Sequence, residues 1–570
     1  MGRENKRNRI FFLRYDWLPF MCLLGLSFLV GIVTFRDYGM SMDESAMIAL
    51  GKKSLSAYLT LQPLTQEAIP SSPILVYYGP LFAMGTAAVT EVLLYLFPDF
   101  IRSDLWHLCY FLGFLLAVCC LYLLAWRWFS PSVAFGVALL FSSQPLLWGH
   151  AFINPKDIPF LAFFLLSLVS GLWCCDRLFG TAYTRFTRNH WQNQIEQLHV
   201  RWKELSRSSQ DTSGKIDGLK EVTEQIKALI FALRQPVFWV SAIALGLSTS
   251  IRVVAPMVGL IIVILALGRG GKKAIGPLCG YFLIAALVTY GSWPALWANP
   301  IEHYLKSWQM AFQFPWQGKI FFMGEFWRAW ELPWFYLPLL FAIQFTEPLV
   351  ILASSGLILL IVRIKHFRSP ELPLLILLWF ILPVGVLIFK RPPLYDNFRQ
   401  VLFLVPPLFL LAGVALEEIY ARLRSPLIRF VFYLVLFFPG VYGYLQLHPY
   451  EYTYYNSFVG GVKGASRAFE TEYWMTSFRE AIEYINQIAP PSKRVLVWEG
   501  ARLVANFIRP DLILVENRGN TEKSNLDNDY LIISSRYHKD EKIFKAAPIL
   551  YQVERQGVPF TVVKAIGESP

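Results

Sequence analysis

Long apolar segments recur along this chain, and they constrain its fold more than any other feature. Runs of about 17–25 apolar residues are long enough to cross the hydrocarbon core of a bilayer as helices. Hydrophobic residues make up 55% of the 570 residues, charged residues only 16%, and the mean hydropathy is +0.43. Soluble domains carry about 25% charged residues. The chain is therefore predicted to be a multi-pass α-helical membrane protein.

The positions of basic residues predict the orientation of the spans. Cytoplasmic loops of membrane proteins are enriched in Lys and Arg. Basic residues cluster at the N-terminus and in the turns 269–273, 363–368 and 422–429, so these segments are predicted to lie inside. The net charge of +12 is thereby explained without a nucleic-acid partner. Eleven spans are predicted, with the N-terminus in the cytoplasm and the C-terminus outside: 17–35, 107–126, 133–149, 158–175, 236–251, 253–268, 274–290, 346–362, 372–389, 400–416 and 430–447.

The remaining segments divide the chain into a membrane domain, 1–447, and a tail, 448–570. The polar segment 176–235 is predicted to be a cytoplasmic insertion, partly an amphipathic helix. The apolar stretch 81–97 is predicted to lie on the outer surface without crossing. The tail is predicted to be a small extracytoplasmic α/β domain with a helix at 478–488. Its expected strands are 494–499, 512–516, 530–534, 549–553 and 560–565.

Aromatic residues are dense in the outer loop between the seventh and eighth predicted spans. Tryptophan and tyrosine favour the boundary between bilayer and water. We therefore expect this loop to form helices that lie in the membrane interface. The loop contains Trp293, Trp297, Trp308, Trp316, Trp327, Trp330 and Trp334.

An acidic pair, Asp43 and Glu44, follows the first predicted span at the outer surface. Carboxylates at this depth are within reach of the head group of a lipid-borne substrate. The same face is predicted to gather charged residues from four loops or helix ends. The predicted span cores contain no Asp, Glu, Lys or Arg, whereas a transporter of charged solutes is expected to place ionisable residues there. The one-sided distribution favours an enzyme that acts at the membrane surface.

Transfer of a sugar at such a face requires two kinds of group. A carboxylate takes the proton from the attacking acceptor hydroxyl. Cations, or a divalent metal held by carboxylates, stabilise the charge on the departing phosphate. Nucleotide sugars are confined to the cytoplasm, so a donor on the outer side is expected to be lipid-linked.

The chain resembles the C-type (GT-C) membrane glycosyltransferases of the protein mannosyltransferase and aminoarabinose transferase kind. The resemblance covers most of residues 1–456. It is carried by Asp43-Glu44, by His150 with Asn154-Pro155-Lys156-Asp157, by Arg252, by Tyr395-Asp396-Asn397-Phe398-Arg399, and by the segment 448–456. The polar insertion and the α/β tail are not general features of that family.

The resemblance implies a hexosyl or pentosyl transferase of the plasma or inner membrane, with an extracytoplasmic active site and a polyprenyl-phosphate-sugar donor. The acceptor is expected to be a lipid, a glycan or a protein, and the resemblance does not decide among them. Asp43 and Glu44 match the family's catalytic acid, which serves as general base or metal ligand. The other candidates match by position and charge: Lys156, Arg252 and Arg399 for the donor phosphate, His150 and Asp157 as additional site residues, and Asp43 with Asp157 as ligands of a divalent metal.

Other interpretations of the same residues remain open. Ser41-x-x-Glu44 also matches a capping box at the start of a helix. Arg399 could anchor a helix at the interface by snorkelling, and Lys156 and Arg252 likewise. Asp157 could cap the fourth span. A transporter or flippase of lipid-linked sugars is the main alternative function, and a ligase or phosphotransferase that uses the same carriers is the next.

Overall fold

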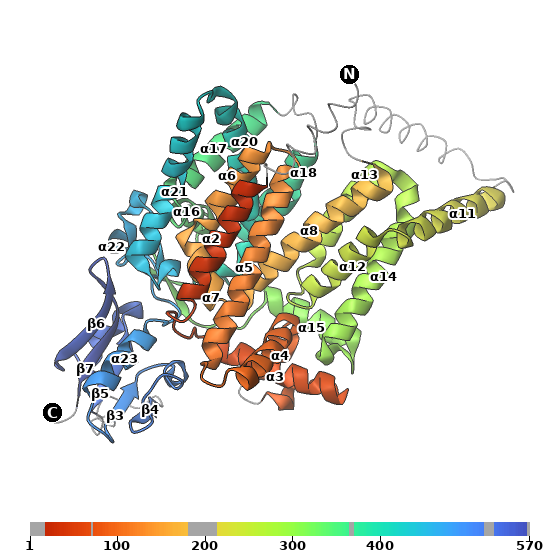
Figure 1. Cartoon of the computed structure of the whole chain (residues 1–570). Coiled ribbons are helices and arrows are strands. Elements are labelled where there is room, and N and C mark those ends of the chain that lie inside the picture. The colour runs from red at the N-terminus through yellow and green to blue at the C-terminus, as the bar shows by residue number, and fades with distance from the viewer. Residues whose placement is uncertain (1–16, 70–71, 181–213, 364–369, 518–528, 567–570) are drawn as a thin grey trace.

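The computed structural model describes residues 17–69, 72–180, 214–363, 370–517 and 529–566. The chain is mostly helical, with one small sheet near the C-terminus (Figure 1). The basic N-terminal segment, and residues 181–213 of the predicted insertion, lie outside the described residues. The rest of the insertion includes the predicted helix, α11 (Gly214–Leu233).

Two long helices form the centre of the helical part. Most side chains of α5 (Arg102–Trp126) and α8 (Asp157–Phe179) are buried, and the two helices pack against each other. A helix that is apolar on all sides is stable only when other helices or lipid surround it. The surrounding helices are α2 (Leu18–Thr34), α6 (Pro131–Ser142), α7 (Pro145–Ile153), α12 (Pro236–Thr249), α13 (Pro256–Gly270), α14 (Ile275–Ser292), α16 (Tyr336–Ile343), α17 (Glu347–Val362), α18 (Glu371–Ile376), α19 (Leu382–Lys390), α20 (Pro406–Arg422) and α21 (Pro426–Leu447).

The peripheral helices expose large apolar side chains. Val33 of α2 is 70% exposed, Leu445 of α21 is 78% exposed, and Leu283 of α14 is 62% exposed. In water such surfaces are unfavourable, whereas lipid tails accept them at no cost. The chain is therefore an integral membrane protein.

Five described helices are long and apolar enough to cross a membrane, or up to seven if each bent pair is one span. One of the five is the run Pro256–Ser292, in which a 3₁₀ turn, Gly271–Ala274, joins α13 to α14. The predicted span 133–149 is broken: α6 and α7 meet at an angle of 62° before Pro145, whose ring disfavours a continuous helix. The predicted span 400–416 begins as a 3₁₀ segment, Arg399–Leu404, and α20 starts only at Pro406. The count of eleven spans remains a prediction.

Charged residues are concentrated at the two ends of α8. Near its C-terminal end, Arg127 and Arg269 each bind both Asp176 and Glu371, at 2.5–2.8 Å, and so join α5, α8, α13 and α18. Asp157 begins α8 at the other end and belongs to a second charged cluster described below. Nineteen residues separate Asp157 from Asp176 along the helix, which at 1.5 Å per residue is about 28 Å. That length matches the hydrocarbon core, about 30 Å.

Short helices cover the end of the bundle where Asp157 lies. These are α3 (Glu44–Thr60), α4 (Leu81–Leu96) and α15 (Pro300–Phe312) (Figure 1). The aromatic loop, predicted to be helical, also forms a two-stranded hairpin of β1 (Lys319–Phe322) and β2 (Glu325–Arg328). Met323 and Gly324 both have positive φ at its turn, as a two-residue hairpin loop requires. The loop therefore contains helices, as predicted, and in addition a hairpin that was not predicted from the sequence.

The C-terminal part is a five-stranded mixed sheet in the order β4-β3-β5-β7-β6. The parallel strands are β4 (Ile513–Glu516), β3 (Arg494–Val497) and β5 (Tyr530–Ser534); β7 (Val558–Ala565) is antiparallel to β5 and to β6 (Ile549–Arg555). All five side chains of the central β5 are buried. Helix α23 (Phe478–Ile488) buries Ala481, Ile482 and Ile485 against the sheet. The predicted helix and all five predicted strands are confirmed.

Candidate active site

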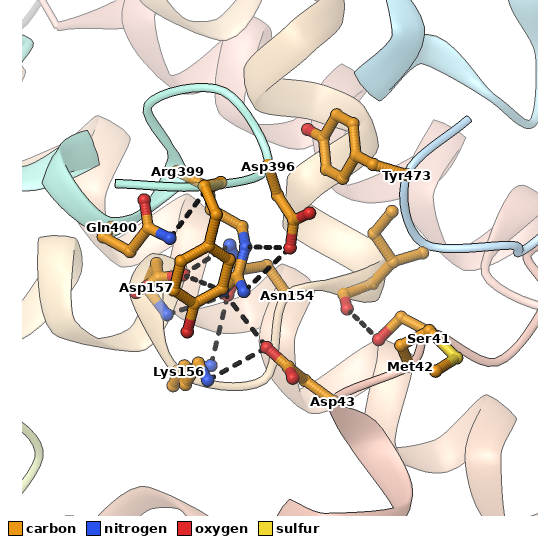
Figure 2. A network of polar contacts seen from close by, with 12 residues as sticks. Ser41, Met42, Asp43, Asn154, Lys156, Asp157, Asp396, Arg399, Gln400 and Tyr473 are labelled. Atoms are coloured by element: carbon orange, nitrogen blue, oxygen red, sulfur yellow. Dashed lines mark hydrogen bonds and ion pairs between the residues drawn. The ribbon is translucent and has the colours of Figure 1, made fainter. Parts of the chain in front are cut away.

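The loop between α2 and α3 brings Asp43 to a cluster of cations. Asp43 immediately precedes α3, and its side chain is 28% exposed. One carboxylate oxygen, Oδ2, lies 2.9 Å from Lys156 Nζ and 3.1 Å from Arg399 Nη1. The sequence placed these three residues in separate outer segments, and the fold brings them into direct contact (Figure 2).

Asp157, at the start of α8, belongs to the same cluster. The Asp157 backbone N–H donates to Asn154 Oδ1 at 2.8 Å, so the Asn154 side chain satisfies the first backbone N–H of α8, and the Asp157 carboxylate is left to pair with other groups. Its carboxylate binds Arg252 Nη2 and lies 3.4 Å from Arg399 Nη1. Asp157 is buried, and these contacts balance its charge.

Arg399 is the centre of the cluster, with only 2% of its side chain exposed. Figure 2 shows its guanidinium among three carboxylates, Asp43, Asp157 and Asp396. Asp396 Oδ2 accepts from Nε at 3.1 Å and from Nη2 at 3.0 Å, so one carboxylate oxygen binds two N–H groups and orients the guanidinium. The rings of Tyr395 and Trp474 lie 5.0 and 4.9 Å from the Arg399 Cζ. Such cation–π contacts favour Arg over Lys.

The surrounding cations control the charge of Asp43. Burial acts to raise the pKa of its carboxyl group, but Lys156, Arg399 and Arg252 outweigh burial and hold the pKa well below its usual value. Burial likewise acts to lower the pKa of Lys156, and the charge of Asp43 outweighs it, so that the pKa is raised. Both groups are therefore ionised at neutral pH.

Glu44 does not join this cluster. Its fully buried carboxylate accepts the Ser41 backbone N–H at 2.6 Å and lies 3.1 Å from His107 Nε2 on α5. The Ser41 hydroxyl donates to the backbone carbonyl of Ile153 at 2.7 Å. These contacts hold the turn that carries Asp43. Only half of the capping box is present, because Glu44 accepts the Ser41 N–H, whereas the N-cap of α3 is Asp43 and the Ser41 hydroxyl binds Ile153.

His150 lies next to the cluster, on α7, without contacting its cations. The Asn154 amide lies 3.2 Å from His150 Nδ1 and also donates to Asp157 Oδ2 at 3.1 Å. The Tyr473 hydroxyl lies 3.0 Å from His150 Nε2. If Nδ1 accepts from the amide, Nε2 carries the proton and donates to Tyr473. His150 thus connects Asn154 to the C-terminal part of the chain.

A cavity of about 580 Å³ opens beside the cluster. Apolar side chains of α13, α15 and α19 line most of it, among them Leu260, Trp308 and Leu382. Its charged lining residues are Lys156, Arg252 and Arg399, and no Asp or Glu from the described part of the chain lines it. Arg252 Nε is buried there and has no hydrogen-bond partner among the described residues. A cavity with mostly apolar walls and three cations in its lining fits an amphiphile with an anionic head group.

The cluster fits an anion better than a divalent metal. Asp43 and Asp157, the predicted metal ligands, are each already paired with two cations. Over the described ranges, no group of three or more His, Cys, Asp or Glu side chains is arranged to hold a metal ion. Calcium and magnesium prefer carboxylate-rich oxygen sites. A metal at Asp43 would be repelled by Lys156 and Arg399.

The sequence prediction missed several residues of this site. Asp396 was predicted as an outer-face carboxylate and as part of the segment 395–399, but was given no role in the site. Tyr473, Trp474 and Arg536 belong to the tail, which was predicted to be a separate domain. Arg536 Nη2 nevertheless lies 2.7 Å from Asp396 Oδ1. Nothing in the local sequence around Arg536 indicates this contact, because it depends on how the sheet packs against the helices.

Solved structures similar to the chain include two from one bacterium and one from an archaeon. ArnT from Cupriavidus metallidurans bound to undecaprenyl phosphate has a TM-score of 0.47 and 12% identity, over 96% of this chain and 98% of that chain. The same protein in the apo state has a TM-score of 0.45 and 14% identity, with the same coverage. The archaeal oligosaccharyltransferase AglB from Archaeoglobus fulgidus, in complex with an inhibitory peptide and a dolichol-phosphate, has a TM-score of 0.45 and 12% identity, over 93% of this chain and 71% of that chain.

No family model and no curated protein matches the chain. The solved structures are of the same kind as the proteins that the sequence motifs resemble. At this degree of similarity they establish no activity for the chain, and the function is inferred from the geometry of the site.

Proposed function

We propose that this protein is an integral membrane glycosyltransferase. It takes a sugar from a polyprenyl-phosphate-linked donor and transfers it to an acceptor hydroxyl at the outer face of the membrane. Asp43 is the general base, and Lys156, Arg252 and Arg399 bind the donor phosphate.

One observation carries the proposal: the lining of the mostly apolar cavity includes three cations and, among the described residues, no acid. A neutral lipid would leave the cations without an anionic partner, and a free sugar nucleotide would leave the apolar walls without an apolar group to bury. A polyprenyl phosphate satisfies both, since its isoprene units bury against Leu260 and Leu382 while its phosphate meets Arg252 and Arg399.

The reaction follows from the positions of these groups. The acceptor oxygen attacks the anomeric carbon of the donor sugar, the bond between that carbon and the phosphate oxygen breaks, and the lipid phosphate departs with the bonding electrons. Asp43, at the open edge of the cluster, takes the acceptor proton. Fixed cations stabilise the charge that develops on the phosphate without reorganising during the reaction.

The ion pairs of Asp43 explain how a strongly acidic carboxyl group can act as a base. Without donor, Lys156 and Arg399 both bind Asp43 and lower its pKa. A donor phosphate competes with Asp43 for the same two cations. When they turn to the phosphate, the pKa of Asp43 rises and the carboxylate becomes more basic. The base is therefore activated only when the donor is bound.

The test is saturable binding of undecaprenyl phosphate to purified protein, followed by sugar release from a labelled polyprenyl-phosphate donor. Arg399→Gln should weaken binding by about tenfold or more, because a buried bidentate donor is lost. Arg391→Gln is the matched control: Arg391 carries the same charge in the same loop but is exposed and does not line the cavity. Equal binding by both variants, or donor movement across vesicles without sugar release, would contradict the proposal.

A further inference from the structure

Arg536 reaches from the sheet into the cluster of charges. It follows the central strand β5, and its side chain is only 14% exposed. Its Nη2 lies 2.7 Å from Asp396 Oδ1 and 3.2 Å from Glu470 Oε1, and its Nη1 donates to the Tyr473 carbonyl oxygen at 2.9 Å. These contacts use a planar fork of donors that only arginine offers.

Asp396 connects Arg536 to Arg399. Its Oδ2 accepts from Arg399 and its Oδ1 from Arg536, so the two oxygens of one carboxylate are divided between two guanidinium groups. The backbone that Arg536 holds at Tyr473 leads directly to Trp474, whose ring lies 4.9 Å from Arg399 Cζ. Arg536 therefore supports Arg399 on two sides, through a carboxylate and through an aromatic ring.

We propose that Arg536 is a positioning residue for donor binding, which acts through Asp396 and Trp474 to aim the guanidinium of Arg399 at the donor phosphate. This inference rests on the proposed function. It assigns the C-terminal sheet a part in the reaction, namely to complete the phosphate site of the helical domain.

The charges of the region explain the effect of losing Arg536. Asp396 and Glu470 are 5% and 3% exposed, and both rely on Arg536 for a counter-charge. Without it, Asp396 is left with Arg399 as its nearest cation and binds it with both oxygens. The guanidinium is then drawn from the cavity toward Asp396, and fewer of its N–H groups remain for a phosphate.

The experiment measures undecaprenyl phosphate affinity, donor KM, kcat and thermal midpoint for Arg536→Gln and Arg536→Lys. The matched control is Arg555→Gln. Arg555 is also a partly buried tail arginine. It binds one carboxylate, Glu480 at 2.9 Å, and the backbone carbonyls of His448 at 2.9 Å and Glu554 at 2.8 Å. It therefore controls for the loss of a partly buried tail arginine that makes an ion pair and backbone contacts, without contacting the cluster.

We expect Arg536→Gln to weaken undecaprenyl phosphate binding and raise donor KM by about tenfold, with a smaller effect on kcat. Arg536→Lys should recover the thermal midpoint but not the affinity. In a double-mutant cycle, Arg536→Gln in the Asp396→Asn background should add little, because both changes act on Arg399.

Three results overturn the inference, and they are distinguishable. If Arg536→Gln and Arg555→Gln change affinity equally, Arg536 is only structural. If the effects of Arg536→Gln and Asp396→Asn add, Arg536 does not act through Asp396. In both cases the proposed function stands. If the wild-type protein shows no saturable binding of undecaprenyl phosphate, the proposed function fails and the inference fails with it.

Discussion

Replacing Asp43 with Asn removes one negative charge from the site and keeps the shape of the side chain. We expect two effects of opposite direction. Turnover falls, because the amide cannot take the acceptor proton. Affinity for undecaprenyl phosphate rises, because the phosphate no longer competes with a carboxylate for Lys156 and Arg399.

The size of each effect follows from the contacts. Loss of a general base lowers kcat by about 10²–10⁴. The carboxylate makes ion pairs of 2.9 and 3.1 Å and is 28% exposed. Its pairs are therefore worth more than fully exposed ones, which contribute about 0.2–1 kcal/mol each. If the two ion pairs together contribute about 1.4 kcal/mol, their loss corresponds to about tenfold tighter binding of undecaprenyl phosphate.

The assay compares undecaprenyl phosphate affinity with single-turnover sugar transfer at saturating donor. Asp37→Asn is the matched control, since Asp37 lies in the same loop and pairs with His448 instead of the cluster. Wild-type turnover by Asp43→Asn would exclude Asp43 as the base. Weaker lipid binding by Asp43→Asn, with a normal thermal midpoint, would refute the idea that carboxylate and phosphate compete.

Three further predictions concern the lipid phosphate, the lipid chain and pH. Arg399→Lys should raise donor KM by about tenfold and Arg399→Ala by more, because lysine keeps the charge but not the planar fork; equal, near-wild-type values for both would remove Arg399 from the site. Leu382→Trp, which narrows the cavity, should raise KM for long polyprenyl donors more than for short ones and leave kcat unchanged; equal KM increases for both lengths would show that the chain lies elsewhere. Burial acts to lower the pKa of His448, but the carboxylates of Glu451 and Asp37 outweigh it and raise the pKa to about 9. The stabilisation is therefore complete below about pH 6.5 and lost as pH rises toward 9, so the thermal midpoint should fall over that range in the wild type and stay flatter in His448→Gln.

Predictions from the sequence succeeded where local pattern decides the structure. The apolar runs were sufficient to predict a helical membrane protein, and the alternating segments of the tail were sufficient to predict its five strands. Both patterns lie within short stretches of sequence, because burial periodicity is a property of neighbouring residues. The same local rules did not predict that the chain bends between α6 and α7, or that the aromatic loop contains a hairpin. A hairpin depends on two positive-φ positions, and Met323 is an unusual residue for one of them.

The amino-acid sequence alone was enough to predict the class of protein and the charged residues available outside the spans, because both depend on composition and on the order of apolar and charged segments. It named Asp43, Lys156, Asp157, Arg252 and Arg399 as separate candidates. That these five form one cluster follows from the packing of the helices, which also pairs Glu44 with His107 and His150 with Asn154. Arg536 joins them from 137 positions beyond Arg399, a contact that exists only because the sheet packs on the helical domain. Long-range ion pairs leave no local pattern in a sequence, and the packing that forms them is set by all the segments between.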